Sequence, residues 1–478
     1  MVVANVDDVL NEIGFGCMQA LMVFTCSLTC VFLSNEIMGV GLVAVEIACE
    51  FSLSNKQLSL LSSAAFAGLI LTSHYSGYLT DKIGRRKIMI YSMVLAMASS
   101  IISILMPSFY FFLFWRFMTG LLISGVSVNN ITYVSEFTKV KLQSVVVNIM
   151  CFAFAFGAIY VPVVAHFLSP LSRILFSWGN FHLRAWRLNM LLNSTPGFIA
   201  IILMWILPET AKFLLSVGKE DRAYETLNRL CLKNRGKDLQ SLGITGVFQA
   251  DLPESSAKKR NFFESLWYDT VPLFKPPYLR NFLICTVILS GYFFVGNGIA
   301  LWFMKLRQIM SDSNMIACDM IKYTKTTHSS SMCSQKTSNF IDGIVLGCVF
   351  LACCILISLL LICVRNSYIQ LLYAIVATIC GFSLNFLKLQ LPILIAMVLF
   401  SSLLASSIPL ISSVLCAVVP THLRGMAINM SYLFARLSVV IASAIIGSCM
   451  VPYCLVTFNI FVLFTLAVAI FTCFLPKI

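Results

Sequence analysis

Twelve apolar runs, each about 20 residues long, constrain this chain more than any other feature of its sequence. They lie near residues 17–42, 58–80, 88–106, 109–134, 144–168, 188–207, 281–303, 342–364, 367–386, 391–417, 425–449 and 453–475. A helix of about 20 residues crosses the ~30 Å bilayer core and satisfies its own backbone hydrogen bonds. Charged residues make up 11% of the chain, against about a quarter in soluble domains. The sequence predicts an all-α membrane protein with twelve transmembrane helices.

The distribution of lysine and arginine predicts the orientation. Twelve spans place both termini on one side, and most of the basic residues lie in the segments on that side. The short turn at 81–87 is the strongest signal, because long loops count for less. We therefore expect both termini in the cytosol, in the plasma membrane or an intracellular vesicle membrane. The net charge of +13 then reflects topology, and nucleic acid is not expected as a partner.

One polar insertion, 208–280, separates six spans from six, so we expect an N-terminal half at 1–207 and a C-terminal half at 281–478. Two of its pieces, Glu209–Val217 and Glu220–Leu232, have helical spacing of apolar residues and should form short amphipathic helices on the cytosolic face. Pro208 could begin the first. A carrier built of two halves holds its substrate between them near the bilayer midplane.

The eighteen cysteines include no CxxC pair, so we predict neither a zinc site nor another metal site. Cys318 and Cys333 share the loop at 304–341 and could form a disulfide if that loop faces an oxidising compartment; the alternative is two free thiols. Enzyme signatures such as GxSxG, HExxH and the Walker lysine are not found. We therefore expect no cofactor, and any transport must be facilitative or driven by a gradient.

The stretch GYLTDKIGRRK, at 77–87, is the most charged turn between two spans. The simplest interpretation is a basic turn that fixes topology. Its residue types suit a moving part as well: Gly77 permits close helix contact and Gly84 a tight turn. The carboxylate of Asp81 could accept N–H groups at the positive end of a neighbouring helix.

This turn resembles the G-x-x-x-D-R/K-x-G-R-R/K signature of the major facilitator superfamily, and it follows the second span as it does there. Three further matches are Arg116-Phe-Met-Thr-Gly120 in the fourth span, Leu207-Pro-Glu-Thr-Ala-Lys-Phe-Leu214 after the sixth and Pro420-Thr-His-Leu-Arg-Gly425 before the eleventh. The resemblance implies two six-helix bundles, with spans 1, 4, 7 and 10 lining a central cavity.

Two stretches are similar to the synaptic vesicle glycoprotein 2-like group, a neighbour of the organic cation and anion transporters: Asn35-Glu-Ile-Met38, and Phe434-Ala-Arg436-Leu. The chain departs from that group at Leu33, where an aspartate is usual, which puts a coupling mechanism with two carboxylates in doubt.

The resemblance also implies a cytosolic gate. By analogy, Asp81 would meet the start of the eleventh span, just after Arg424. Arg85 and Arg86 would pair with Glu136 and Glu209, forming a latch that holds the inner gate shut.

Three charged residues inside spans are candidates for a substrate or coupling-ion site, because such charges usually face a cavity or a partner. Glu36 is either a proton or cation site or a structural carboxylate paired with an arginine. Arg116 serves substrate or gating, or else packing. Arg436 is either the counter-charge of an anionic substrate or a structural residue, since the eleventh span packs behind the cavity in the resembled fold.

The seventh span contains Gly291-Tyr-Phe-Phe-Val-Gly-Asn-Gly298. One hypothesis is that Tyr292 and Asn297 touch substrate while the glycines let the helix bend. The other is helix packing through small residues.

These patterns predict a secondary transporter that moves a small organic solute, which could be charged, by alternating access, with or without a coupling proton or cation. The alternative is a membrane protein that keeps this fold but serves binding or trafficking without transport.

Overall fold

The computed structural model describes residues 2–171, 176–178, 181–249, 270–310, 340–419 and 421–475, with a few further positions between 267 and 321. Within these ranges twelve helical spans are long and apolar enough to cross a membrane, which confirms the predicted fold class. The spans are α2 (Cys17–Leu42), α4 (Asn55–Ile83), α5 (Arg85–Leu105), α6 (Phe109–Ser135), α7 (Val140–Leu168), α8 with α9 (Ala185–Asn193 and Thr195–Ile206), α13 with η5 and α14 (Leu279–Tyr292, Phe293–Asn297 and Gly298–Met310), α16 (Phe340–Leu360), α17 (Asn366–Ser383), α18 with α19 (Gln390–Ser406 and Ile408–Val418), α20 (Thr421–Cys449) and α21 (Cys454–Thr472).

Three spans are interrupted, and each break has a local cause. Pro196 and Pro409 stand in the first turns of α9 and α19, where a missing N–H and a fixed φ are tolerated. In the seventh span, residues 293–297 form one turn of π-helix. Such turns are rare and are frequently found at functional sites. This span continues to Met310, further than the apolar run near 281–303 indicates.

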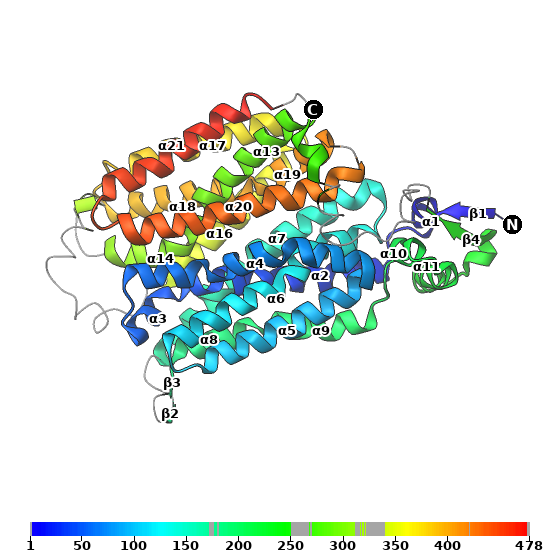
Figure 1. Ribbon diagram of the computed structural model, residues 1–478, viewed down its shortest axis with the longest axis horizontal. Coiled ribbons are helices and arrows are strands. Elements are labelled where there is room, and N and C mark those ends of the chain that lie inside the picture. The colour runs from blue at the N-terminus through cyan, green and yellow to red at the C-terminus, as the bar shows by residue number, and fades with distance from the viewer. Residues whose placement is uncertain are drawn as a thin grey trace.

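The spans gather into two bundles that lie side by side (Figure 1). Helices α2 to α9, blue to green-cyan, form the N-terminal bundle, and α13 to α21, green to red, form the C-terminal bundle. We call the surface where they meet the seam. The inner end is the end that carries the α4–α5 turn, α10 and α11, and the opposite end is the outer end. The described N-terminal residues lie at the inner end.

Outside the spans the chain forms short helices and strands. They are β1 (Val2–Asn5), α1 (Val6–Ile13), α3 (Ala44–Phe51), η1 (Ser169–Leu171), β2 (Phe176–Trp178), β3 (Phe181–Leu183), α10 (Ala211–Ser216), α11 (Glu220–Arg235), η2 (Leu239–Leu242), β4 (Ile244–Phe248) and η4 (Val271–Phe274). The two amphipathic helices expected after the sixth span correspond to α10 and α11. Pro208 does not begin α10, because the cap is Thr210, whose hydroxyl accepts from the Phe213 N–H at 3.4 Å.

At the inner end these pieces build a small domain that the sequence did not indicate. β1 pairs in parallel with β4, and α1 and α11 contribute to a separate apolar core that includes Val9, Leu227 and Leu230. Helix α11 begins with Glu220 and Asp221 and has Lys233 and Arg235 in its last turn, which complements the helix dipole. The domain packs against the N-terminal bundle through residues such as Met22 and Met204 of the same core.

The predicted disulfide is wrong. Cys318 is bonded to Cys454, 136 residues away, and Cys333 lies outside the described residues. Cys454 is the first residue of α21, at the outer end of the C-terminal bundle. Proximity in sequence did not identify the partner of Cys318, because α20 ends at the outer surface on which Cys318 lies and so brings Cys454 next to it. The bond joins the segment after the seventh span to the twelfth.

Candidate functional site

A buried ion pair links the first and fourth spans inside the N-terminal bundle. Arg116 Nη1 lies 2.8 Å from Oε2 of Glu36, and Nη2 donates to the Glu36 carbonyl oxygen at 2.5 Å. The hydroxyls of Ser100 and Ser194 donate to the same carboxylate, at 2.9 and 3.3 Å. Glu36 is 4% exposed and Arg116 1%. Each charge thus has its counter-charge within one bundle.

This arrangement favours the structural alternative for both residues. The carboxylate of Glu36, on span 1, accepts from groups of spans 3, 4 and 6, none of which belongs to the C-terminal bundle. Removing one member of such a pair leaves an uncompensated buried charge, which is strongly destabilising. Neither Ser100 nor Ser194 was predicted as a partner, since serine in an apolar run carries no signal of which way it faces.

Arg436 is placed differently. It lies midway along the eleventh span, Leu423–Cys449, and reaches across the seam into the N-terminal bundle. Its Nη2 donates to the Ser127 hydroxyl of α6 at 2.8 Å, and its Nη1 donates to the Ser73 hydroxyl of α4. The side chain is 7% exposed. Both partners are neutral, so the positive charge is hydrogen-bonded but not neutralised.

Aromatic rings complete the surroundings of Arg436. Its guanidinium carbon lies 5.8 Å from the centre of the Tyr432 ring, one turn earlier on α20. Phe293 packs edge-on against Tyr432, with 5.6 Å between ring centres. Among the described residues no carboxylate lies within ion-pair distance of Arg436. The seam therefore holds a cation beside aromatic faces, midway along the eleventh span.

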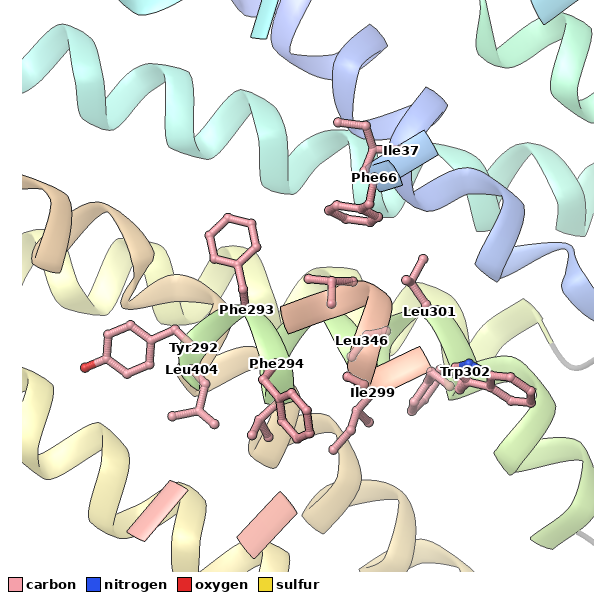
Figure 2. Packing of buried hydrophobic residues seen from close by; sticks show 14 of the residues in the cluster. Ile37, Phe66, Tyr292, Phe293, Phe294, Ile299, Leu301, Trp302, Leu346 and Leu404 are labelled. Atoms are coloured by element: carbon pink, nitrogen blue, oxygen red, sulfur yellow. The ribbon is translucent and has the colours of Figure 1, made fainter. Parts of the chain in front are cut away.

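The two substrate-contact candidates in the seventh span, Tyr292 and Asn297, have different surroundings. Tyr292 is fully buried and donates to Gln370 Oε1 of α17 at 3.3 Å, inside the C-terminal bundle, which argues against contact with substrate. Figure 2 shows Phe293 and Leu301 pointing from this span toward the N-terminal helices that carry Ile37 and Phe66, whereas Tyr292 points in another direction.

Asn297 is 8% exposed and lies four positions after Phe293, at the end of the π-helical turn. Its amide is not among the fully buried polar atoms that lack a partner in the described part of the chain. Contact of Asn297 with substrate therefore stays a prediction that rests on its place in the seventh span. The carbonyl of Gly296 is held by Ser401 of α18 at 2.8 Å.

The turn between α4 and α5 binds several elements of the N-terminal bundle together. Arg85 Nε lies 2.7 Å from Oε1 of Glu136, at the end of α6. Burial raises the pKa of Glu136 above its ordinary value, and Arg85 opposes that shift. Glu209 accepts from the backbone N–H of Arg86 at 3.0 Å. Gly84 has φ +115°, and a Cβ there would collide with the Glu209 carboxylate, so glycine is required.

The other residues of the predicted gate are Arg86, Asp81, Gly77 and Arg424. The side chain of Arg86 donates to backbone carbonyls at the end of α9 and not to Glu209. Asp81 lies 3.9 Å from Arg85, and its side chain is 76% exposed. Gly77 faces Asn429 of α20 at ordinary contact distance. Arg424, at the start of α20, is exposed.

Of the predicted latch, the pair of Arg85 with Glu136 is present, whereas Arg86 meets Glu209 only through its backbone N–H. Arg85, Glu136, Arg86 and Glu209 all belong to the N-terminal bundle or to the segment directly after it, so their contacts cannot by themselves hold the two halves together. They fix the α4–α5 turn against α6 and α9. A contact between the halves near this end is the approach of Gly77 of α4 to Asn429 of α20.

At the outer end the halves touch directly. A Cβ on Gly41 of α2 would lie 2.7 Å from the Leu301 carbonyl oxygen of α14, and one on Gly347 of α16 would lie 2.9 Å from the Ala158 carbonyl oxygen of α7. The Ser443 hydroxyl of α20 donates to the Ser59 carbonyl oxygen at 3.2 Å. At this end the backbones of the two halves lie in close contact, which closes the seam.

Among the described residues no group of three histidine, cysteine or carboxylate side chains could hold a metal ion. The serines that hold Arg436 were missed from the sequence. Ser73 and Ser127 belong to long apolar helices with scattered hydroxyls, and only the packing of α20 against α4 and α6 distinguishes them from their neighbours.

Comparison with known proteins agrees with this geometry. The model of the Major Facilitator Superfamily matches residues 24–443. The chain is 32% identical over 48% of its length to the putative transporter svop-1 of Caenorhabditis elegans, covering 42% of that protein. It is 28% identical over 62% of its length to the human putative transporter SVOPL, covering 54% of it. It is also 28% identical over 37% of its length to rat solute carrier family 22 member 12, covering 29%. The chain spans about half the length of the curated relatives it matches.

Among solved structures, the xylose transporter XylE from E. coli in a partially occluded inward-open conformation superposes with a TM-score of 0.69 at 15% identity. The match covers 96% of this chain and all of XylE. At that identity the likeness concerns the fold. The proteins of this fold and family are transporters and not enzymes. The chain belongs to the Major Facilitator Superfamily, and within it the chain is similar to the synaptic vesicle 2-like and organic ion transporter-like group.

Proposed function

We propose that this protein is a secondary transporter that carries a small organic anion by alternating access. The observation that supports the proposal most directly is Arg436, which spans the seam at mid-membrane and is held there by two hydroxyl groups. Ionisable groups inside a membrane span are costly and are found mostly where they pair or serve a substrate path.

The chemistry around Arg436 suits a carboxylate. A guanidinium presents its N–H donors as a planar fork that matches two carboxylate oxygens. The Ser73 and Ser127 hydroxyls occupy one donor on each terminal nitrogen, and an incoming anion would exchange a neutral partner for a charged one. Tyr432 and Phe293 supply an apolar wall for the organic part of the solute.

The movement follows from the contacts between the halves. The outer end is closed through Gly41 and Leu301, whereas Arg424 at the inner end of α20 is exposed. Rocking of one bundle against the other about the seam would expose Arg436 to each side in turn. We place both termini in the cytosol because the basic α4–α5 turn lies at the same end as the described N-terminal strand.

We propose that any coupling proton or cation binds at a residue other than Glu36. Its carboxylate is held by Arg116 inside one bundle, and releasing it would uncover a buried charge. The XylE structures include one of a proton:xylose symporter, so a proton gradient belongs in the test of transport here.

Uptake into proteoliposomes tests the proposal. A panel of radiolabelled monocarboxylates, dicarboxylates and organic cations is offered with and without a pH gradient. We expect saturable uptake of a carboxylate, reduced about 10- to 100-fold in kcat/KM by Arg436→Gln, since a hydrogen bond to a charged group is worth about 1.5–3 kcal/mol. Arg365→Gln, which removes an exposed arginine, is the matched control.

Two results would overturn it. One is uptake of a carboxylate that Arg436→Gln leaves unchanged. The other is the lack of any uptake by protein shown to be folded and correctly oriented, which would favour a binding or trafficking role on the same fold.

A further inference from the structure

A cavity of about 610 Å³ opens at the inner end of the N-terminal bundle, away from the seam. Its walls come from the α4–α5 turn, the segment after α9, and helices α10 and α11. This volume lies within the range of pockets that bind small ligands, about 300–1,000 Å³. The proposed transport path does not pass through it.

The lining of the cavity is strongly basic. Its cationic members are Lys82, Arg86, Lys87, Lys219, Arg222 and Arg229. Two carboxylates, Glu209 and Glu225, also line it. Glu209 is already engaged by the N–H groups of Arg86 and Thr210, at 3.0 and 3.2 Å. The remaining charge is therefore dominated by lysine and arginine.

Several of these cations have no counter-charge among the residues that the structure describes. Within the described ranges Lys87, Arg222 and Arg229 take part in no ion pair. Like charges gathered around one hollow repel each other, which raises the free energy of the empty cavity. An anion with several negative charges would relieve that repulsion and accept charge-assisted hydrogen bonds from lysine and arginine.

The cavity lies next to the membrane surface. Arg86, one of its walls, donates from Nε to the Met204 carbonyl oxygen at 3.0 Å and from Nη2 to the Trp205 carbonyl oxygen at 2.6 Å. These residues are at the end of the sixth span, and Trp205 is 66% exposed. Tryptophan at that level is typical of the membrane–water interface, so the cavity stands at the height of lipid headgroups.

We propose that this cavity binds an anion with several phosphate groups, such as the inositol phosphate headgroup of a membrane lipid or a soluble molecule of the same chemistry. Basic clusters beside a span attract such headgroups with about 1 kcal/mol per lysine or arginine. A turn that served topology alone would need the charges but not a cavity shared with α11, whose residues lie far along the sequence from the turn.

The bound anion would act on the transporter through its walls. Lys87 belongs to the first turn of α5, whereas Arg222 and Arg229 belong to α11. A ligand that contacts both would tie the small inner domain to the third span. We expect it to stiffen the α4–α5 turn without entering the seam.

Binding to the full-length protein in phosphatidylcholine nanodiscs tests the proposal in two arms. One arm includes 2% phosphatidylinositol bisphosphate in the nanodisc, and the other adds soluble inositol trisphosphate. Binding is measured by the shift in melting temperature and by titration with a fluorescent phosphoinositide. The variant Lys87→Gln/Arg222→Gln/Arg229→Gln removes charge from the cavity, and Lys233→Gln, on the exposed surface of α11 outside it, is the matched control.

We expect the triple variant to weaken binding at least about tenfold, while Lys233→Gln changes it less than twofold. Binding in both arms would identify the phosphate groups as sufficient, and binding in the lipid arm alone would identify a membrane headgroup; either supports the site. The site is refuted if neither probe binds the wild type, or if Lys233→Gln weakens binding per charge as much as the triple variant does. Because these readouts do not involve solute uptake, failure of transport leaves them unaffected.

Discussion

Two buried arginines occupy two different regions of this molecule. Arg116 lies inside the N-terminal bundle, 2.8 Å from a carboxylate, whereas Arg436 lies at the seam and contacts two serines. Both are more than nine-tenths buried. Burial alone therefore does not separate a structural arginine from a functional one.

The difference lies in where the counter-charge comes from. Arg116 is neutralised by Glu36 of its own bundle, so its pairing survives any movement of one half against the other. Arg436 is on one half and its partners are on the other, so movement of the halves changes its contacts. A cation at the seam without a negative partner suits a site that binds and releases an anionic solute.

The largest effect is expected inside the bundle. Arg116→Met leaves the Glu36 carboxylate buried without its counter-charge and should lower the free energy of unfolding by about 3–5 kcal/mol. SDS titration of purified protein, followed by tryptophan fluorescence, measures it. Glu36→Gln/Arg116→Met removes both charges and should recover most of the loss.

If the double variant is no more stable than Arg116→Met, the pair is not the reason for the loss. A folded double variant that has lost uptake while keeping its stability would give Glu36 a role in transport and remove the contrast between the two regions.

An intermediate effect is expected at the inner end, where two glycines of one turn face different regions. Gly84 faces Glu209 inside the N-terminal half at φ +115°, so Gly84→Ala should lower the free energy of unfolding by about 1–3 kcal/mol through strain and the displaced carboxylate. Gly77 faces Asn429 across the seam with room for a methyl group. Gly77→Ala should leave stability unchanged or raise it by up to about 1 kcal/mol. Equal losses in the same SDS titration would contradict this account.

The smallest effect on stability is expected at the seam. Arg436→Met removes a buried charge that has no ionic partner in the described structure, and with it the desolvation cost that an unpaired buried charge carries. We expect the free energy of unfolding to change by less than about 1 kcal/mol, although transport is lost. A loss as large as that of Arg116→Met, measured side by side, would make Arg436 a structural residue.

The membrane spans could be predicted because hydrophobic length is a local property. The twelve apolar runs correspond to the twelve spans found in the described residues. The small inner domain was not, since β1 and β4 are each too short to stand out and pair across more than two hundred residues. The disulfide prediction failed for a similar reason: Cys454 is the first residue of α21, and its nearness to Cys318 is a property of the folded bundle.

For the candidate site, the sequence identified the charged residues but not their directions. A helix that is apolar all round has no polar face to orient it, so Glu36 could not be assigned to the bundle interior or to the cavity. The same holds for Tyr292, which turned out to contact Gln370. Partners such as Ser73 and Ser100 are small hydroxyl residues found throughout the spans, and packing alone gives them their roles.

The parallel pairing of β1 with β4 also has a practical consequence. It attaches the first described residues to the segment that follows α11, within the small domain that packs against the N-terminal bundle. Val3 is 59% exposed on that strand. One spectroscopic label at Val3 and a second at Arg365, on the C-terminal bundle, would lie on the two halves. The distance between the two labels would then report the conformational cycle without altering any residue at the seam.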